Sequence, residues 1–218
     1  MKNRNITAYF FVVLLFLFIL SFSIALPIYL RPFYYWQINA LSLTDTGFTA
    51  EEIKTAYNAV LDYLTLPCRE FSCGIMEYSA EGAAHFADCK TLFNLNLTVL
   101  LISGFSVFLL TLLQKTGKIS KLLIHGRSAS FYSGVLAIIF PLIIGGFAAI
   151  DFEFAFTVFH LIFFPGKTNW GFNPELDEII NVLPEQFFMN CATLIGVSIL
   201  ILSAICIVLG IKERKNEK

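Results

Sequence analysis

Four long runs of apolar residues dominate the pattern of hydrophobic and polar positions along the chain. They cover approximately residues 6–28, 92–113, 130–150 and 188–210. Each is close to the roughly 20 residues that a helix needs to cross the hydrocarbon core of a bilayer. Because that core offers no water to exposed backbone groups, apolar segments of this length form helices there. The pattern predicts an all-α integral membrane protein with four transmembrane helices, in a single membrane domain over residues 1–218.

Charged residues are distributed unevenly over the connecting segments. The N-terminus, the 114–129 segment and the tail together hold ten Lys or Arg residues and two acidic residues. The segments 29–91 and 151–187 hold five Lys or Arg residues and fourteen acidic residues. Basic residues beside membrane spans are retained in the cytoplasm. We therefore expect both termini in the cytoplasm and an extracytoplasmic cap built from the two acidic outer loops.

The first apolar run shares two features with a secretory signal peptide, since "MKNRN" is basic and "SIAL" contains small residues. Its apolar core, from Ile6 to Leu26, is longer than the roughly 7–15 residues of a signal-peptide core. We therefore expect the run to be retained as a membrane helix. Cleavage would leave the rest of the topology unchanged.

The first outer loop contains a well-marked short helix. Thr49 and Glu52 have the spacing of a capping box, and apolar residues then recur at helical intervals up to Pro67. This helix is expected to be a packing element. The preceding "RPFYYW", at 31–36, is typical of an aromatic belt at the outer membrane interface.

The second outer loop is too rich in phenylalanine to be a solvated segment. We expect it to bury itself in the membrane interface or between helices, in the manner of a re-entrant element. Pro165 and Gly166 interrupt its apolar run. Asn173 and Pro174 are expected to open a second short helix with Asp177 in its first turn.

Overall composition supports the membrane assignment. The chain is 57% hydrophobic and 16% aromatic, with 24 phenylalanines and only 14% charged residues, which is far from the composition of a soluble domain. No nucleic-acid partner is expected. Three cysteines of the first outer loop and one at the outer end of the last run form no clean disulfide framework. A Cys68–Cys73 bridge and unpaired thiols both remain open.

Three ionisable residues stand just before the second apolar run. Glu81, His85 and Asp88 are spaced i, i+4 and i+7, so on a helix they project from one face. Ser79 is expected to cap that helix. Ionisable groups near membrane depth are costly and usually mark a functional site.

A second histidine lies in the phenylalanine-rich outer loop. His160 follows Glu153 by seven residues and Thr157 by three, so on a helix the three share a face. Histidine has an unperturbed pKa near 6.5, which suits proton transfer at neutral pH. Both outward-facing histidines therefore sit at the membrane boundary with carboxylates alongside.

Three chemistries fit this set of residues. Metal binding has ligands at helical spacing, but the sequence has no HExxH or cysteine-pair signature, and no metal is expected. Cysteine nucleophile chemistry is open because Cys89 follows His85 by four residues. The third chemistry is histidine acid–base catalysis of acyl transfer, with a carboxylate fixing the imidazole tautomer. No G-x-S-x-G motif supports a serine hydrolase.

Two motifs together resemble the lipoprotein intramolecular transacylase family, Lit. The first is a Glu-x3-His-x2-Asp-x-Lys pattern formed by Glu81, His85, Asp88 and Lys90. The second is "FHLIFFPGKTNWGFNPELDEIINVLPEQFF" at 159–188. The resemblance extends over nearly the full chain, including the four apolar runs and both outer loops.

The resemblance implies an enzyme of the bacterial plasma membrane, found in some Gram-positive bacteria, with its active site on the extracytoplasmic side. Enzymes of this family act on lipoproteins whose N-terminal cysteine carries a diacylglyceryl group and a free α-amine. They move the sn-2 acyl chain from the glyceryl oxygen to that amine, which gives the lyso-form lipoprotein. The implied partners are this substrate and membrane lipid. Neither a cofactor nor a covalent enzyme intermediate is required.

The resemblance also suggests roles for individual residues. His85 is assigned as general base on the α-amine, oriented by Glu81 or Asp88. His160 is assigned to donate to the oxyanion or to protonate the leaving glyceryl oxygen. Four further residues match the loop motif and are assigned to substrate binding or loop support: Trp170, Asn169, Asn173 and Asp177.

Two other interpretations remain open at this point. A non-catalytic membrane assembly factor would tolerate alanine at both histidines. A metal-dependent membrane hydrolase would be sensitive to chelators. The sequence does not indicate the oligomeric state.

Overall fold

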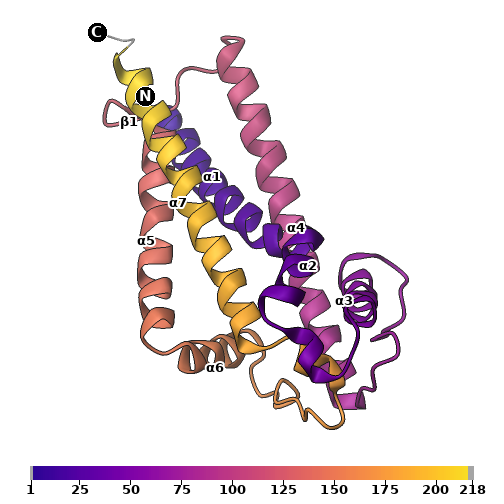
Figure 1. Ribbon diagram of the computed structural model, residues 1–218. Coiled ribbons are helices and arrows are strands. Elements are labelled where there is room, and N and C mark those ends of the chain that lie inside the picture. The colour runs from indigo at the N-terminus through magenta and orange to yellow at the C-terminus, as the bar shows by residue number, and fades with distance from the viewer. Residues whose placement is uncertain (1, 216–218) are drawn as a thin grey trace. The chain divides into compact units, whose positions relative to one another are not determined.

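The structure, a computed structural model, describes residues 2–215 (Figure 1). Four of the described helices are long and apolar enough to cross a membrane: α1 (Lys2–Tyr29), α4 (Ala80–Lys115), α5 (Ala129–Ile150) and α7 (Glu185–Lys215). They contain the four predicted apolar runs, so the all-α fold with four membrane-spanning helices is confirmed. The chain divides into two compact units, which are described in turn. Its organisation as one membrane domain over residues 1–218 stays a prediction.

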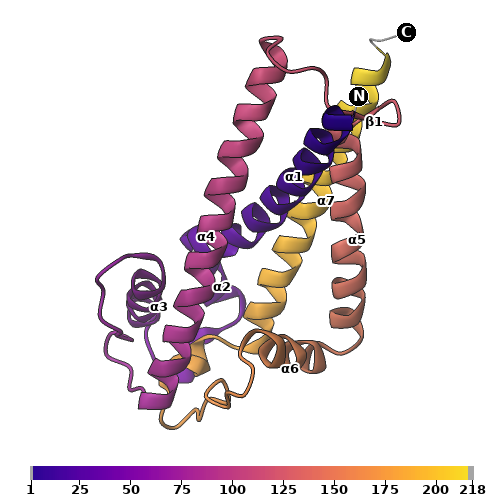
Figure 2. The ribbon, with the colours of Figure 1, turned by 180° about the vertical axis from the view of Figure 1, so that it is seen from behind.

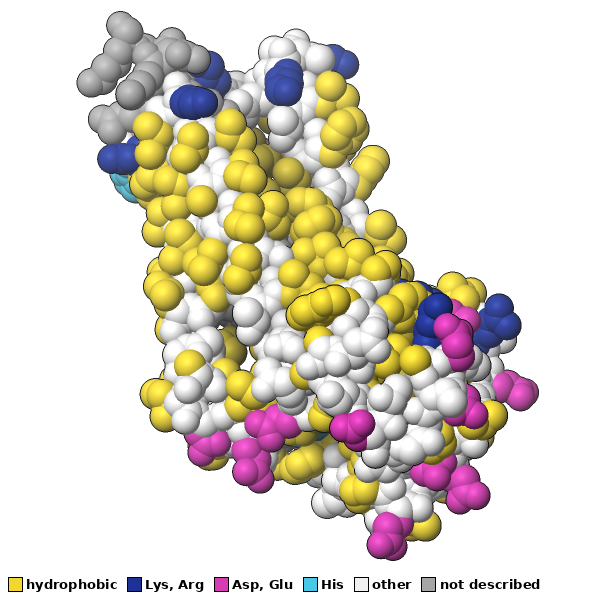
Figure 3. Space-filling model, viewed as in Figure 1, with side chains coloured by type: hydrophobic (Ala, Val, Ile, Leu, Met, Phe, Trp, Pro, Cys, Tyr) yellow, Lys and Arg dark blue, Asp and Glu magenta, His cyan; other side chains and the backbone are white. Residues whose placement is uncertain are grey.

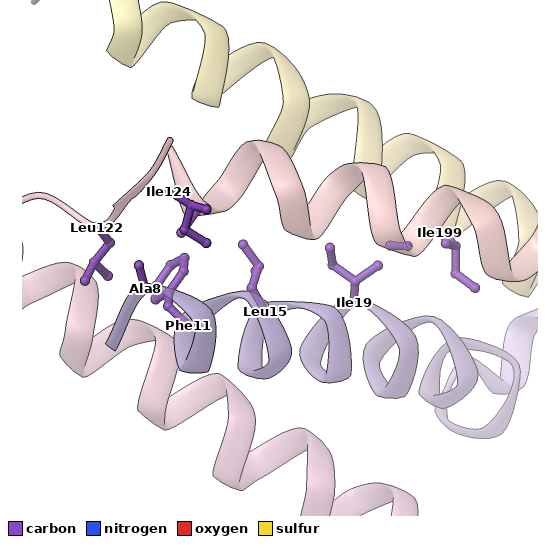
Figure 4. Packing of buried hydrophobic residues seen from close by; sticks show 9 residues of the cluster. Ala8, Phe11, Leu15, Ile19, Leu122, Ile124 and Ile199 are labelled. Atoms are coloured by element: carbon purple, nitrogen blue, oxygen red, sulfur yellow. The ribbon is translucent and has the colours of Figure 1, made fainter. Parts of the chain in front are cut away.

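The first unit comprises Met1–Ala25, Asn96–Gly146 and Leu194–Lys218. Its core is a cluster of buried apolar side chains (Figure 4): Ala8, Phe11, Leu15, Ile19, Leu122, Ile124, Ala129, Ala137 and Ile199. The members from α1 recur every three or four residues and therefore line one face of that helix. Figures 1 and 2 show α1 crossing between α4 and the pair α5 and α7. This position explains why 44% of the residues in the most apolar stretch of α1 are buried but only 6% of those in α4.

A small antiparallel hairpin closes the segment between α4 and α5. Strand β1 (Leu123–Ile124) pairs with β2 (Arg127–Ser128), with Leu123 opposite Ser128 and Ile124 opposite Arg127. The two turn residues, His125 and Gly126, both have positive φ angles, of 49° and 75°. Two-residue hairpin turns favour this geometry because it matches the twist of the strands. His125 is exposed at the tip, away from the buried core of this unit.

Gly134 allows α5 and α7 to approach closely. A Cβ atom at this position would lie 2.7 Å from the carbonyl oxygen of Ser203. We expect Gly134→Ala to force the helices apart and to lower the free energy of unfolding by about 1–3 kcal/mol, measured as a lower thermal midpoint in detergent. Gly145→Ala on the same helix is the control, because a Cβ atom there meets nothing within 4 Å. Equal midpoints for the two variants would contradict this close approach.

The second unit comprises Leu26–Leu95 and Phe147–Thr193. Its shorter elements are α2 (Arg31–Ala40), η1 (Leu43–Thr46), α3 (Ala50–Thr65), α6 (Phe152–Phe163) and η2 (Glu178–Val182). The predicted capping box of α3 is confirmed: the Glu52 N–H donates to Thr49 Oγ1 at 3.3 Å, and the Thr49 N–H donates to the Glu52 carboxylate at 2.8 Å. Acidic side chains are spread over the surface of this unit (Figure 3).

The aromatic segment 31–36, predicted to form an interfacial belt, does not turn all of its rings outward, and its place at the membrane interface stays a prediction. It forms the start of α2, and Tyr34 is fully buried against α3, with its ring stacked on Tyr57 at a centroid distance of 3.7 Å. The Tyr34 hydroxyl donates to the Val182 carbonyl at 2.8 Å. Trp36 remains 65% exposed. The helical period turns some of these aromatic rings into the core and others outward, which a belt assignment does not distinguish.

The loop after α6 also differs from its prediction. Asn173 and Pro174 open a turn rather than a helix, and the helical segment η2 begins only at Glu178. The side chain of Asn173 accepts a hydrogen bond from the Glu175 N–H at 3.0 Å. An asparagine that bonds to the backbone two residues ahead forms a turn in place of a helical start. Asp177 therefore precedes the helical segment and does not lie in its first turn.

Candidate active site

His85 lies at the polar start of α4, before the apolar run at 92–113. Ser79 caps this helix as predicted, since its Oγ accepts a hydrogen bond from the Gly82 N–H at 2.9 Å. The side chain of His85 is buried, with 5% of its surface exposed. The helix start therefore holds this imidazole inside the second unit and not on a solvated face.

His160 lies in the last turn of α6. The helix is capped by Asp151, whose carboxylate accepts from the Phe154 N–H at 2.9 Å. His160 Nδ1 lies 2.7 Å from the Phe156 carbonyl oxygen. A carbonyl only accepts hydrogen bonds, so Nδ1 carries the proton and the neutral ring has its lone pair on Nε2. This Nε2 makes no hydrogen bond to any residue between 2 and 215.

The two histidines are brought together although they lie 75 positions apart in the sequence. Their ring centroids are 5.6 Å apart. Phe164 and Phe172 pack against His85 at 4.9 and 5.5 Å, and Trp170 stacks on His160 at 4.9 Å. The pair therefore lies in an aromatic enclosure. Sequence reasoning missed Phe164 and Phe172, since nothing distinguishes them from the other phenylalanines of the loop.

Asp88 joins α4 to the loop that follows α6. Its carboxylate forms an ion pair with Lys167 and accepts a hydrogen bond from Asn169 Nδ2 at 3.1 Å. The neighbouring Lys167 lowers the pKa of the Asp88 carboxyl, as does the bond from Asn169. Asp88 is therefore ionised at neutral pH and holds the loop beside His85.

Asp177 anchors the first turn of α4. It is 3% exposed, and one of its carboxylate oxygens accepts from the Ser79 N–H at 2.8 Å and from the Ser79 hydroxyl at 2.9 Å. A Cβ atom on Gly82 would lie 2.9 Å from Asp177 Cγ, so only glycine leaves room for this carboxylate. Ser79, Asp177, Glu81 and Asn169 line a small pocket of 190 Å³.

The remaining predicted site residues make other contacts. Glu81 is exposed and makes no hydrogen bond or ion pair with either histidine within the described chain. The Trp170 indole N–H donates to the Lys167 carbonyl at 3.0 Å, so its contribution to the site is its ring. Asn173 is exposed in its turn. The structure thus groups His85, His160, Asp88, Asn169 and Trp170, with Asp177 beneath the helix start.

Comparisons with known proteins agree with this arrangement. A family model described as lipoprotein intramolecular transacylase Lit matches residues 9–188. The chain belongs to the Lit family. A solved structure of the membrane-integral Lit from Bacillus cereus is 26% identical, with a TM-score of 0.87, over 99% of this chain and 97% of that one.

Two further structures are of the same Bacillus cereus protein with a histidine replaced by arginine or by alanine. Both are 25% identical to this chain, with TM-scores of 0.81 and 0.80. The first match covers 100% of this chain and 96% of that one, and the second covers 98% and 96%. No curated protein sequence matches the chain.

Burial keeps both histidines of this Lit family member neutral. Removal from water lowers the pKa of His85 to about 4, with a smaller lowering from His160, and Asp88 and Asn169 oppose the shift. Burial also lowers the pKa of His160, while the bond to the Phe156 carbonyl opposes it. Two neutral imidazoles therefore stand side by side at neutral pH.

Histidine NMR in detergent is expected to show both buried rings neutral at pH 7, with His85 protonating near its pKa of about 4. The unfolded chain takes up these protons first as the pH falls below 6.5, so acidification lowers the free energy of unfolding. His125→Ala and His160→Ala assign the three histidine signals. A His85 or His160 ring that protonates above pH 6.5 would contradict the burial of the pair.

Cys89 is the third group beside the histidines. Its Sγ lies 3.4 Å from His85 Nε2. Burial raises the pKa of the thiol to about 12, so the reactive thiolate is scarce at neutral pH. This environment disfavours the cysteine nucleophile. All five cysteines are free, and within residues 2–215 no group of three or more His, Cys, Asp or Glu side chains is placed to hold a metal ion.

Proposed function

We propose that this protein transfers the sn-2 acyl chain of a diacylglyceryl-cysteine lipoprotein to the α-amine of the same cysteine. Membership of the Lit family supports the reaction, and the adjacent neutral histidines supply the chemistry it needs. The observation that carries the proposal is the 2.7 Å bond between His160 Nδ1 and the Phe156 carbonyl. It leaves Nε2 of a buried histidine as a free proton acceptor.

Transfer of an acyl chain from an ester oxygen to an amine is downhill, because an amide is more stable than an ester. The barrier lies in forming a tetrahedral intermediate with an oxyanion. The α-amine has a pKa near 8 in water and is partly protonated there. The same burial that keeps the histidines neutral favours the uncharged amine, which is the nucleophile.

One proton must move during the reaction. The amine nitrogen attacks the sn-2 ester carbon, and the new C–N bond leaves that nitrogen positively charged and acidic. His160 Nε2 takes its proton, and the Phe156 carbonyl stabilises the resulting imidazolium. When the C–O bond breaks, the same Nε2–H donates that proton to the leaving glyceryl oxygen. The proton has then been returned to the substrate, and no group remains bound to the enzyme.

This assignment gives the base role to His160 and not to His85, which the sequence-based hypothesis favoured. The neutral His160 ring has its single proton committed to the backbone, so it enters the reaction as an acceptor. His85, with its ring 5.6 Å away, accepts the second N–H of the amine and orients it. A catalytic role for Glu81 stays a prediction.

The aromatic enclosure contributes by folding the substrate. Donor and acceptor belong to one molecule, so holding them in attack geometry replaces an encounter between two molecules. Phe164, Phe172 and Trp170 give the acyl chain and the glyceryl group an apolar wall. The membrane supplies the substrate, and we place both termini in the cytoplasm and this site on the extracytoplasmic side.

The proposal is tested in cells that otherwise make only diacylglyceryl lipoprotein. The protein is expressed there, and fragmentation mass spectrometry of one lipoprotein's N-terminal peptide distinguishes N-acyl-monoacylglyceryl cysteine from the isomer of equal mass. We expect conversion to the N-acyl form. An unchanged lipoprotein despite normal membrane insertion would contradict the proposal and favour a non-catalytic membrane factor.

A further inference from the structure

Whether a given ring nitrogen of His85 donates or accepts a hydrogen bond depends on which of the two carries the proton. A neutral imidazole is a donor at one nitrogen and an acceptor at the other. His85 accepts an amine N–H only if its proton is on Nδ1. No backbone carbonyl fixes this choice, in contrast to His160, so another neighbour must do so.

The orientation of the Asn169 amide is fixed by Asp88. The carboxylate can only accept hydrogen bonds, so the group that faces it at 3.1 Å is the NH₂ of Asn169. Lys167 holds Asp88 in its ionised form. The opposite amide orientation would bring Oδ1 of Asn169 against a negative charge. The carbonyl oxygen of Asn169 is therefore held away from Asp88.

That oxygen and His85 Nδ1 share an unusual property. Both atoms are buried, and neither has a hydrogen-bond partner within the described residues. Asn169 nevertheless raises the pKa of His85 as a side-chain hydrogen-bonding neighbour, which is the effect of an acceptor facing the ring. An arrangement in which the two atoms face each other would satisfy both of them and would account for this effect. Each is the partner that the other lacks.

The other nitrogen of His85 has a compatible neighbour. Cys89 Sγ lies 3.4 Å from Nε2, and its buried thiol keeps its proton. In the absence of substrate the thiol donates weakly to the lone pair of Nε2, and the substrate amine takes its place when it binds. Both neighbours of the ring thus favour the same tautomer, in which the proton is on Nδ1.

We propose that Asn169 is a positioning residue that, held by Asp88 and Lys167, fixes the proton of His85 on Nδ1 and leaves Nε2 as an acceptor. Its catalytic consequence rests on the proposed function, in which that Nε2 orients the substrate amine. Asp88 acts on His85 through Asn169. The assignment of Asn169 to substrate binding is then secondary to this role.

Three variants test the proposal. Asn169→Leu keeps the branching of the side chain and removes both its acceptor and its donor, while Asp88→Asn frees the Asn169 amide to adopt either orientation. Thr168→Ala, an exposed neighbour in the same loop, is the control. Nitrogen-15 NMR of histidine-labelled protein shows which ring nitrogen of His85 is protonated. The rate of lipopeptide conversion is measured on the same preparations.

We expect the wild type and Thr168→Ala to show the Nδ1–H form alone, and the other two variants to show a mixture of tautomers. Conversion should fall by about tenfold to a hundredfold in both, the usual cost of losing a partner that orients a histidine. A pure Nδ1–H signal in Asn169→Leu, or an Nε2–H signal in the wild type, would overturn the proposal. The NMR result does not depend on activity. A wild type that shows the Nδ1–H form but converts nothing refutes the proposed function alone.

Discussion

His160→Ala is expected to be inserted and folded but to convert lipoprotein at least about a thousandfold more slowly than the wild type. The substitution removes the Nε2 that takes the proton from the attacking nitrogen and returns it to the leaving oxygen. His85 does not replace it, because its own Nε2 is engaged in orienting the amine. The rate is measured with purified protein in detergent and a synthetic diacylglyceryl lipopeptide.

His125→Ala is the matched control for this variant, because His125 is exposed at the tip of the hairpin between α4 and α5. It should retain the full rate. Loss of the His160 ring also removes its stacking on Trp170 and so changes tryptophan fluorescence even in a folded protein. An equal circular dichroism spectrum and an equal elution volume are therefore needed to show that the variant is folded. A folded His160→Ala protein with a rate within tenfold of the wild type would exclude His160 as the base.

Asp177→Ala is expected to lower the free energy of unfolding of the second unit by about 2–4 kcal/mol. The change leaves the N–H and the hydroxyl of Ser79 without their acceptor. The first turn of α4 then opens, and His85 is no longer held in its position. Conversion of lipopeptide should fall together with stability, because the turn both caps the helix and sets the imidazole.

Hydrogen exchange of the amides at 79–85, followed by mass spectrometry, measures this opening. Asp177→Asn should show an intermediate effect, since its carbonyl oxygen still accepts one hydrogen bond. Glu175→Ala removes an exposed carboxylate from the same loop and should exchange like the wild type. Unchanged protection of these amides in Asp177→Ala would show that the carboxylate does not anchor the helix.

The parts of the fold that follow from neighbouring residues could be predicted. The apolar runs determine four helices because their length and composition leave no alternative in a bilayer. Thr49 and Ser79 were identified as caps because a cap acts on amides two or three residues away. The burial of Tyr34 could not be predicted, since its partners Tyr57 and Val182 lie far along the chain.

The candidate site could likewise be predicted only where it depends on residues close in the sequence. The spacing of His85 and Asp88 placed both on one face of α4 because it depends only on the helical period. Glu81 shares that spacing, but side chains lean toward the N-terminus of a helix, so in the first turn it points off the end. The contacts of Asp88 with Lys167 and Asn169 join residues about 80 positions apart. No pattern among residues close in the sequence predicts such contacts.

A crossover experiment tests the central claim most directly, that the acyl chain moves within one substrate molecule. Purified protein is given an equimolar mixture of two synthetic diacylglyceryl lipopeptides that differ in both the peptide and the sn-2 acyl chain. We predict that mass spectrometry finds on each α-amine only the acyl chain of its own glyceryl group. Crossed products in comparable amounts, or no N-acylated product from a folded protein, would contradict the account.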